Sequence, residues 1–177
     1  MKSKTLALTI LVFLVLVSLV QILYYYPRLP YRVASHFGFN GKPDGWSSRE
    51  IFLIMNIALV VFMGGLFWLS GWLPRKLPDS WINLPHKDYW LAPERRNATF
   101  ETYAIYLYWF GNATLLLFLF LFNSVYRANL MSHPEFGQDV LIYFGLYILF
   151  IIYWTVKFYR EFRVRPENDT TSFGRRS

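Results

Sequence analysis

Four long apolar stretches dominate the chain, and short segments rich in charge, proline and glycine separate them. The first stretch has no charged residue between Lys4 and Arg28. A helix needs about 20 apolar residues to cross a hydrocarbon core ~30 Å thick, and each stretch is close to that length. The pattern therefore predicts four membrane-spanning helices, at about residues 6–24, 51–73, 103–125 and 140–156.

Composition agrees with a protein that lies mostly in lipid. Of the 177 residues, 55% are hydrophobic and 21% aromatic, while only 16% are charged. A soluble domain of this length carries more charge and less aromatic surface. We therefore predict an all-α integral membrane protein with four transmembrane helices and a short structured loop between the first two.

The spans divide the chain into four parts. We expect an N-terminal region with the first two spans, an inner amphipathic loop, a helical hairpin and a mobile polar tail, at residues 1–73, 74–102, 103–160 and 161–177. Within the spans, polar side chains are expected to form hydrogen bonds between helices. These side chains are Asn56, Asn112, Thr114 and Asn123.

Basic residues indicate the orientation. Thirteen of the 18 Lys and Arg residues lie at the N-terminus, in the loop 74–102 or after the fourth span. Short basic segments resist translocation, so both termini and that loop are predicted to be cytoplasmic. The net charge of +7 is spread around the spans rather than along one stripe, so we expect lipids and no nucleic acid as partners.

The loop 27–50, between the first two spans, is predicted to be a compact external element. Asn40-Gly41 and Pro43-Asp44-Gly45 are turn signals, because Gly adopts positive φ without strain and Pro fixes the first turn position. The preceding stretch YRVASHFGF is rich in strand-forming residues. Ser47 or Ser48 can cap the second helix. A β-hairpin is therefore one structure that this loop can form.

The same loop resembles a known signature. The matching residues are Leu29-Pro30, Val33, His36-Phe37, Asn40-Gly41 and Pro43-Asp44-Gly45-Trp46, with a span on either side. This pattern is similar to that of the bacterial membrane domain of unknown function 1648, which also forms the N-terminal part of SdpI-type immunity proteins. The resemblance covers about residues 6–73 and implies a membrane architecture in bacteria. SdpI-type proteins are longer, so it does not extend to their immunity activity.

Four residues of this loop are candidates for binding a ligand or partner: His36, Asn40, Asp44 and Trp46. His36 with Asp44 can form a metal-binding or proton-responsive pair, because a carboxylate fixes the tautomer of a nearby imidazole. The simpler interpretation is that His36 packs under Trp46 while Asp44 makes a turn. A closed zinc site usually takes four ligands, so a metal is expected only if His133 joins the pair.

The inner loop carries a second group of candidates: His86, Lys87, Asp88, Glu94, Arg95 and Arg96. The arginines can form forked hydrogen bonds to phosphate or carboxylate. The simplest interpretation is an interfacial segment whose charges are solvated or bound to anionic lipid. A docking surface for a protein or phosphorylated ligand, and an active site of His86, Asp88 and Glu94, are the alternatives.

Function is predicted from these features together. The chain lacks Cys and has no catalytic sequence motif of the metalloprotease, hydrolase or phosphate-loop kind, so we expect no cofactor and no enzyme activity. The leading hypothesis is a bacterial inner-membrane accessory, sensory or immunity-like subunit that recognises a membrane protein partner, or another copy of itself, through its loops. A small oligomeric transporter or channel is the alternative, and a lipid-headgroup enzyme is a weaker one.

Overall fold

Four long helices carry most of the chain in the computed structural model, which describes residues 2–38 and 40–163. The predicted mobile tail lies, from residue 164 onward, outside the described residues. The elements are, in chain order, α1 (Lys2–Tyr25), the 3₁₀ turn η1 (Tyr26–Arg28), β1 (Arg32–Phe37), β2 (Pro43–Ser48), α2 (Arg49–Ser70), the 3₁₀ turns η2 (Leu73–Lys76) and η3 (Asp79–Trp81), α3 (Lys87–Trp90), α4 (Arg96–Asn129) and α5 (Asp139–Glu161).

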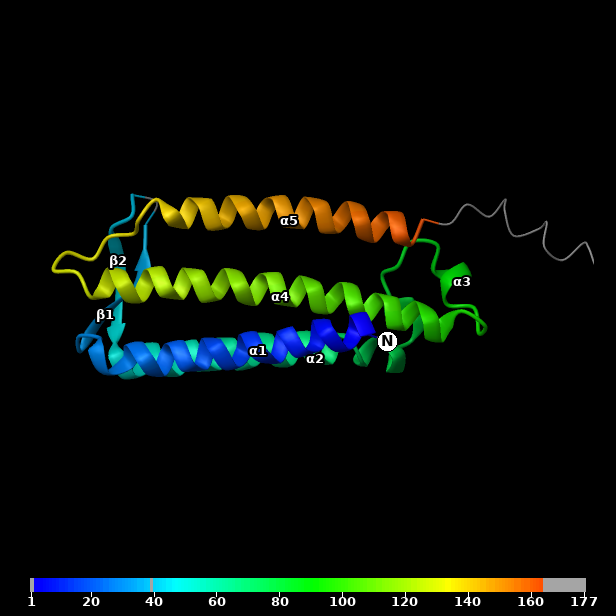
Figure 1. Cartoon of the computed structure of the whole chain (residues 1–177), viewed down its shortest axis with the longest axis horizontal. Coiled ribbons are helices and arrows are strands. Elements are labelled where there is room, and N and C mark those ends of the chain that lie inside the picture. The colour runs from blue at the N-terminus through cyan, green and yellow to red at the C-terminus, as the bar shows by residue number, and fades with distance from the viewer. Residues whose placement is uncertain (1, 39, 164–177) are drawn as a thin grey trace, which may run out of the picture.

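The long helices run along the longest axis of the molecule (Figure 1). Helices α1, α2 and α4 pack against one another, and α5 packs against α4. The β-hairpin lies at one end, and α3 lies at the other end with the N-terminus (Figure 1). All four long helices are long and apolar enough to cross a membrane. The predicted four spans and the hairpin between the first two are therefore confirmed at the level of the fold.

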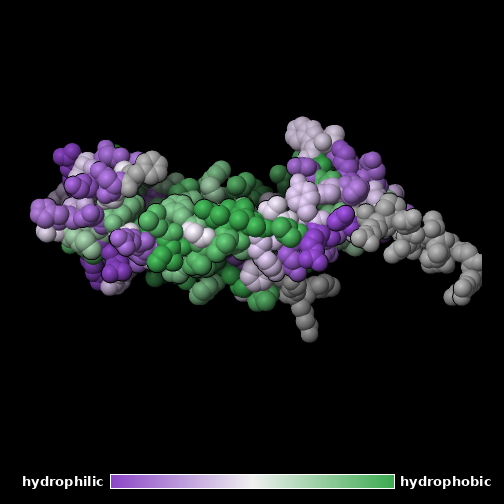
Figure 2. Space-filling view, turned by 90° about the horizontal axis from the view of Figure 1, so that it is seen from above, coloured by the Kyte–Doolittle hydropathy of each residue, from purple (hydrophilic) through white to green (hydrophobic). Residues whose placement is uncertain are grey.

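On the face shown in Figure 2, hydrophobic side chains form a band across the middle of the molecule, and hydrophilic side chains gather at both ends. A protein that crosses a bilayer exposes this pattern, because acyl chains cover the band and headgroups meet the polar ends. Helix α5 contributes strongly to the band, since a far smaller share of its apolar stretch is buried than in the other three long helices.

The ends of α1 and α2 follow from local sequence. Helix α1 stops at Tyr25, and Pro27 lies in the turn η1 that follows. Helix α2 begins after Ser48, whose hydroxyl accepts a hydrogen bond from the Ile51 amide at 3.2 Å. A capping hydroxyl satisfies an amide that has no partner inside the helix. One of the two predicted caps is thereby confirmed.

Helix α4 is longer than the predicted third span. It begins at Arg96 rather than near Tyr103, so residues 96–102, which were assigned to the inner loop, form its first turns. Thr99 and Phe100 are buried there, and the Thr99 hydroxyl donates to the Trp90 carbonyl at 2.8 Å. A hydropathy pattern marks only the lipid-facing part of a helix, whereas tertiary contacts extend this one beyond it.

Several polar side chains inside the bundle form hydrogen bonds, which a medium without water favours strongly. Asn112 donates to the Ala7 carbonyl of α1 at 3.0 Å. The expected bonds between helices also form at Asn123, which accepts from a tyrosine of α1, and at Thr114, which bonds a tyrosine of α5. The expectation is wrong for Asn56, which donates to the carbonyl of Phe52 in its own helix at 2.7 Å.

Glycine allows α1 and α2 to approach closely at one position. A Cβ placed on Gly64 would lie 2.6 Å from the Cγ2 atom of Val15, whereas a Cβ on the neighbouring Gly65 would meet nothing within 4 Å. Val15 is β-branched and its χ1 is stiff in a helix, so it cannot easily move away. The two adjacent glycines therefore differ sharply in what they contribute to packing.

We predict that Gly64→Ala lowers the free energy of unfolding by about 1–3 kcal/mol, because the added methyl group overpacks the contact with Val15. Gly65→Ala is the matched control and should leave stability unchanged or slightly raised, since Ala is the better helix former. Unfolding of the purified protein in mild detergent measures both. Equal effects of the two substitutions would contradict the close approach at Gly64.

Candidate functional site

The two polar ends of the bundle contain the residues that were predicted from the sequence to bind a ligand or a partner. At the hairpin end, β1 and β2 pair antiparallel, with Ala34 opposite Trp46. The turn between them is closed by hydrogen bonds from the Gly38 amide to the Lys42 carbonyl and from the Gly41 amide to the Gly38 carbonyl, both 2.9 Å. Gly41 has a φ of 75°, which only glycine adopts readily. Its presence therefore fixes the shape of this turn.

Asn129, the last residue of α4, holds β1 against the bundle. Its Oδ1 atom accepts from the Ala34 amide at 2.7 Å, and its Nδ2 atom donates to the Ala34 carbonyl at 3.0 Å. The side-chain amide thus pairs with Ala34 as a neighbouring strand would. Both residues are buried, and Nδ2 also donates to the Val125 carbonyl within α4 at 2.9 Å. The hairpin is thereby fixed to the end of a long helix.

The connector between α4 and α5 covers the tip of the hairpin. The Phe136 amide donates to the Gly41 carbonyl at 2.9 Å. The ring of Phe136 stacks on that of Phe37, with the centroids 4.0 Å apart. The two loops that were predicted to lie outside the membrane therefore form one unit, in which β1, the turn and the connector support one another.

His36 and Asp44 do come together on this unit. The His36 Nδ1 and Asp44 Oδ1 atoms are 2.5 Å apart, and the two side chains are 74% and 53% exposed. The preferred interpretation, in which His36 packs under Trp46, is wrong because the imidazole lies in solvent. Within residues 2–38 and 40–163, no three side chains of His, Asp or Glu gather in a way that could hold a metal, so His133 does not complete a site.

Two other candidates of the hairpin differ in role. Asn40 is exposed and shapes the turn, because its Oδ1 atom accepts from the Lys42 amide at 3.0 Å. Trp46 is 43% exposed, and the guanidinium carbon of Arg32 lies 5.2 Å from its ring centroid. Tyr31, which precedes β1 and was not among the sequence candidates, is 80% exposed, and the guanidinium carbon of Arg49 lies 5.0 Å from its ring centroid. Aromatic surface is therefore available on the hairpin.

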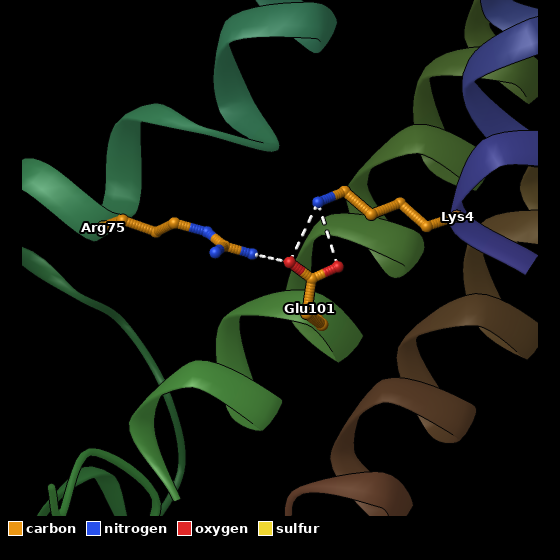
Figure 3. Close-up of polar contacts among 3 residues, drawn as sticks. All are labelled: Lys4, Arg75 and Glu101. Atoms are coloured by element: carbon orange, nitrogen blue, oxygen red, sulfur yellow. Dashed lines mark hydrogen bonds and ion pairs between the residues drawn. The ribbon is translucent and has the colours of Figure 1, made fainter. Parts of the chain in front are cut away.

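At the opposite end, Glu101 joins three segments of the chain (Figure 3). Lys4 of α1 contacts both carboxylate oxygens, at 3.1 and 2.9 Å. Arg75, in the turn η2, donates to the same carboxylate from the other side. The cluster ties the start of α1 and the segment after α2 to the first turns of α4. Sequence reasoning missed it, because the three residues are remote in the chain.

The loop between α2 and α4, residues 71–95, uses its arginines internally. Arg96, which follows it, donates to the Asp79 carboxylate at 2.7 Å. The guanidinium carbon of Arg95 lies 4.0 Å from the centroid of the Tyr89 ring. These contacts favour the interpretation of this loop as a folded interfacial segment, because its arginines are engaged within the protein.

The remaining candidates of this loop are divided between two positions. His86, Lys87 and Asp88 line a polar hollow of about 520 Å³ together with Ser80–Leu84. His86 has a φ of 50°, an uncommon value for a residue with a side chain, and lies at the start of α3. Glu94 is exposed and is not among the lining residues. The proposed catalytic group of His86, Asp88 and Glu94 is therefore not assembled around this hollow.

The fold first defines a class, that of helical proteins with four helices able to cross a membrane and a β-hairpin between the first two. Residues 13–60 match the family model "Domain of unknown function (DUF1648)", so this part of the chain is similar to that family. The match includes the second half of α1, the whole hairpin and the first half of α2. It confirms the resemblance found in the signature loop.

Neither the curated proteins nor the solved structures contain a match to this chain. The similarity to SdpI-type immunity proteins therefore stays a prediction from the signature loop. The DUF1648 match ends before α4, so it does not include Asn129, which anchors the hairpin.

We predict that Asn129→Ala frees the hairpin from α4, because it leaves a buried amide and carbonyl of Ala34 without partners. Hydrogen exchange at the Ala34 amide should accelerate, and the free energy of unfolding should fall by about 1–3 kcal/mol. Asn40→Ala, which removes a hydrogen bond only from the exposed turn, is the control and should have little effect at Ala34. Unchanged exchange in Asn129→Ala would contradict the anchoring role.

A second prediction concerns Glu101. Glu101→Gln leaves Lys4 and Arg75 close together without a negative charge between them, and stability should fall by about 1 kcal/mol at low salt. The loss should shrink as salt is added, because these side chains are partly exposed and screened. Glu94→Gln, at an exposed carboxylate of the same end, should be neutral. A loss that is independent of salt would exclude an electrostatic role.

Proposed function

We propose that the protein is a non-enzymatic, multi-pass protein of the bacterial cytoplasmic membrane that acts as an accessory, sensory or immunity-like subunit. Its hairpin unit, defined as β1, β2 and the connector between α4 and α5, recognises a partner protein. The observation that carries this proposal is a hairpin held rigidly from two sides while large aromatic side chains remain exposed on it.

Rigidity favours recognition, since a surface that is already ordered loses little conformational entropy on binding. Asn129 fixes β1 and Phe136 covers the turn, so the backbone of the hairpin is ordered before any partner arrives. Among the described residues, Trp46 of β2 and Tyr31, which directly precedes β1, are exposed aromatic side chains. Residues of these two types carry a large share of binding energy at protein interfaces.

A second contact is available inside the membrane. Helix α5 packs against α4 and exposes most of its apolar surface, with Leu141 and Leu146 more than 60% exposed. A helix attached on one side can accept another subunit without disturbing α1, α2 and α4. This arrangement supports an accessory subunit or a homo-oligomer.

The orientation proposed for this subunit places the hairpin unit outside the cell and the N-terminal end in the cytoplasm. The distribution of Lys and Arg supports this choice, because basic segments are retained on the cytoplasmic side. In this orientation the hairpin meets extracytoplasmic domains of a partner, and Lys4, Arg75 and Glu101 lie at the cytoplasmic headgroups.

The test is affinity purification of the tagged protein from native membranes in mild detergent, with quantitative mass spectrometry. Trp46→Ala should lower recovery of the partner about tenfold, because it removes a central aromatic contact. His36→Ala changes an exposed side chain of the same hairpin and should lower it by less than about threefold. Protection of the Ala34 amide from hydrogen exchange shows that each variant keeps its fold.

Two results would refute the proposal. One is a wild-type protein that purifies as a monomer with no reproducible partner. The other is a partner whose recovery does not change with Trp46→Ala, because recognition would then not depend on the exposed aromatic surface of the hairpin.

A further inference from the structure

An open hollow of about 340 Å³ lies between the C-terminal end of α5 and the loop that connects α2 to α4. Val156, Tyr159, Arg160 and Arg163 line it from the α5 side, and Pro85 and His86 line it from the loop. Val156, Tyr159 and Arg160 are spaced i, i+3 and i+4, which places them on one face of α5, and Arg163 follows two residues after the helix ends. The hollow is separate from the hairpin unit and lies at the other end of the molecule.

The hollow combines two guanidinium groups with an imidazole, and none of its lining residues is acidic. No ion pair to Arg160 or Arg163 is formed within the described part of the chain. Glu161, the acid nearest in sequence, is not among the residues that line the hollow. The two arginines are therefore available to bind an anion, and guanidinium matches the geometry of phosphate oxygens well.

The position of the arginines is fixed by the buried residue between them and by the loop. Phe162 is 1% exposed, and its carbonyl accepts from the Trp90 Nε1 atom at 2.9 Å. The rings of Phe162 and Trp90 also contact each other, with centroids 5.5 Å apart. The end of α5 is thus held against the α2–α4 loop. Arg160 and Arg163 lie on either side of the anchored Phe162 in the chain.

The apolar wall of the hollow continues along the lipid-facing side of α5. Val156 and Tyr159 are 51% and 58% exposed, and Ile152, one turn earlier, is 56% exposed. A ligand bound at the arginines would therefore extend along an apolar helix surface towards the middle of the bundle. A phospholipid has this combination of an anionic headgroup and acyl chains, whereas free phosphate uses only the charged end.

From this geometry we infer a binding site for an anionic phospholipid, whose phosphate contacts Arg160, Arg163 and His86 while its acyl chains lie along α5. The site lies in the leaflet on the side of the N-terminus. Arg95 and Arg96 were predicted from the sequence as possible phosphate contacts, but Arg95 lies over the Tyr89 ring and Arg96 donates to Asp79. The proposed phosphate contacts are instead Arg160 and Arg163.

The test uses the full-length protein, purified in mild detergent and mixed with equal amounts of phosphatidylglycerol and phosphatidylcholine, with bound lipid counted by native mass spectrometry. Phosphatidylglycerol should be retained in preference to phosphatidylcholine. Arg160→Gln should lower its retention about fivefold, since one cation at the headgroups is removed. Lys157→Gln removes a charge from the same helix outside the hollow and should leave retention unchanged.

Two further measurements distinguish lipid binding in the hollow from general electrostatic attraction and from binding of free phosphate. Val156→Trp fills the hollow without changing charge and should also reduce retention of phosphatidylglycerol. Inorganic phosphate in excess should not displace the lipid, because it lacks the contacts along α5. Retention that is equal in Arg160→Gln and Lys157→Gln, retention unaffected by Val156→Trp, or full displacement by inorganic phosphate would each overturn the assignment of a phospholipid site.

Discussion

The hairpin unit depends on the pairing between Asn129 and the backbone of Ala34. A hairpin of two strands leaves an unpaired edge on each side, and such an element is marginally stable alone. The amide of Asn129 supplies the missing neighbour at one buried position of β1, with both a donor and an acceptor. Because Asn129 ends α4, this pairing transfers the rigidity of a long helix to a short sheet at the end of the bundle.

The N-terminal end of the bundle contains a cluster of charged side chains in addition to buried hydrophobic contacts. Glu101 receives Lys4 and Arg75 from two other segments, and these side chains are partly exposed. Ion pairs at such positions contribute little to stability and depend on salt, whereas the buried amide contacts of Asn129 do not. The two ends therefore differ physically, since buried amide contacts anchor the hairpin unit, whereas the other end combines an ion-pair cluster with a buried hydrophobic cluster that includes Phe100 and Phe162.

The sequence was sufficient for the features that depend on local pattern. The apolar stretches predicted four helices, and the residues from Asn40 to Gly45 predicted the turn of a hairpin, because turn chemistry acts over a few residues. It was not sufficient where distant residues meet. Asn129 reads as a polar residue at the end of a span, and nothing local connects it with Ala34. The early start of α4 was also missed, because buried Thr99 and Phe100 depend on contacts with the α2–α4 loop.

The position of α5 connects the fold with the proposed role. Helices α1, α2 and α4 would remain packed together if α5 moved, since α5 packs against α4 and its far side is exposed. Its first residue, Asp139, accepts hydrogen bonds from Ser124 of α4 and from Tyr143, and its last turn meets Trp90 through Phe162. A partner that displaced α5 would therefore act on both ends together, through the connector that covers the hairpin and through the arginines beside Phe162. If the proposed roles hold, this geometry would connect partner recognition at the hairpin end with lipid contacts at the other end.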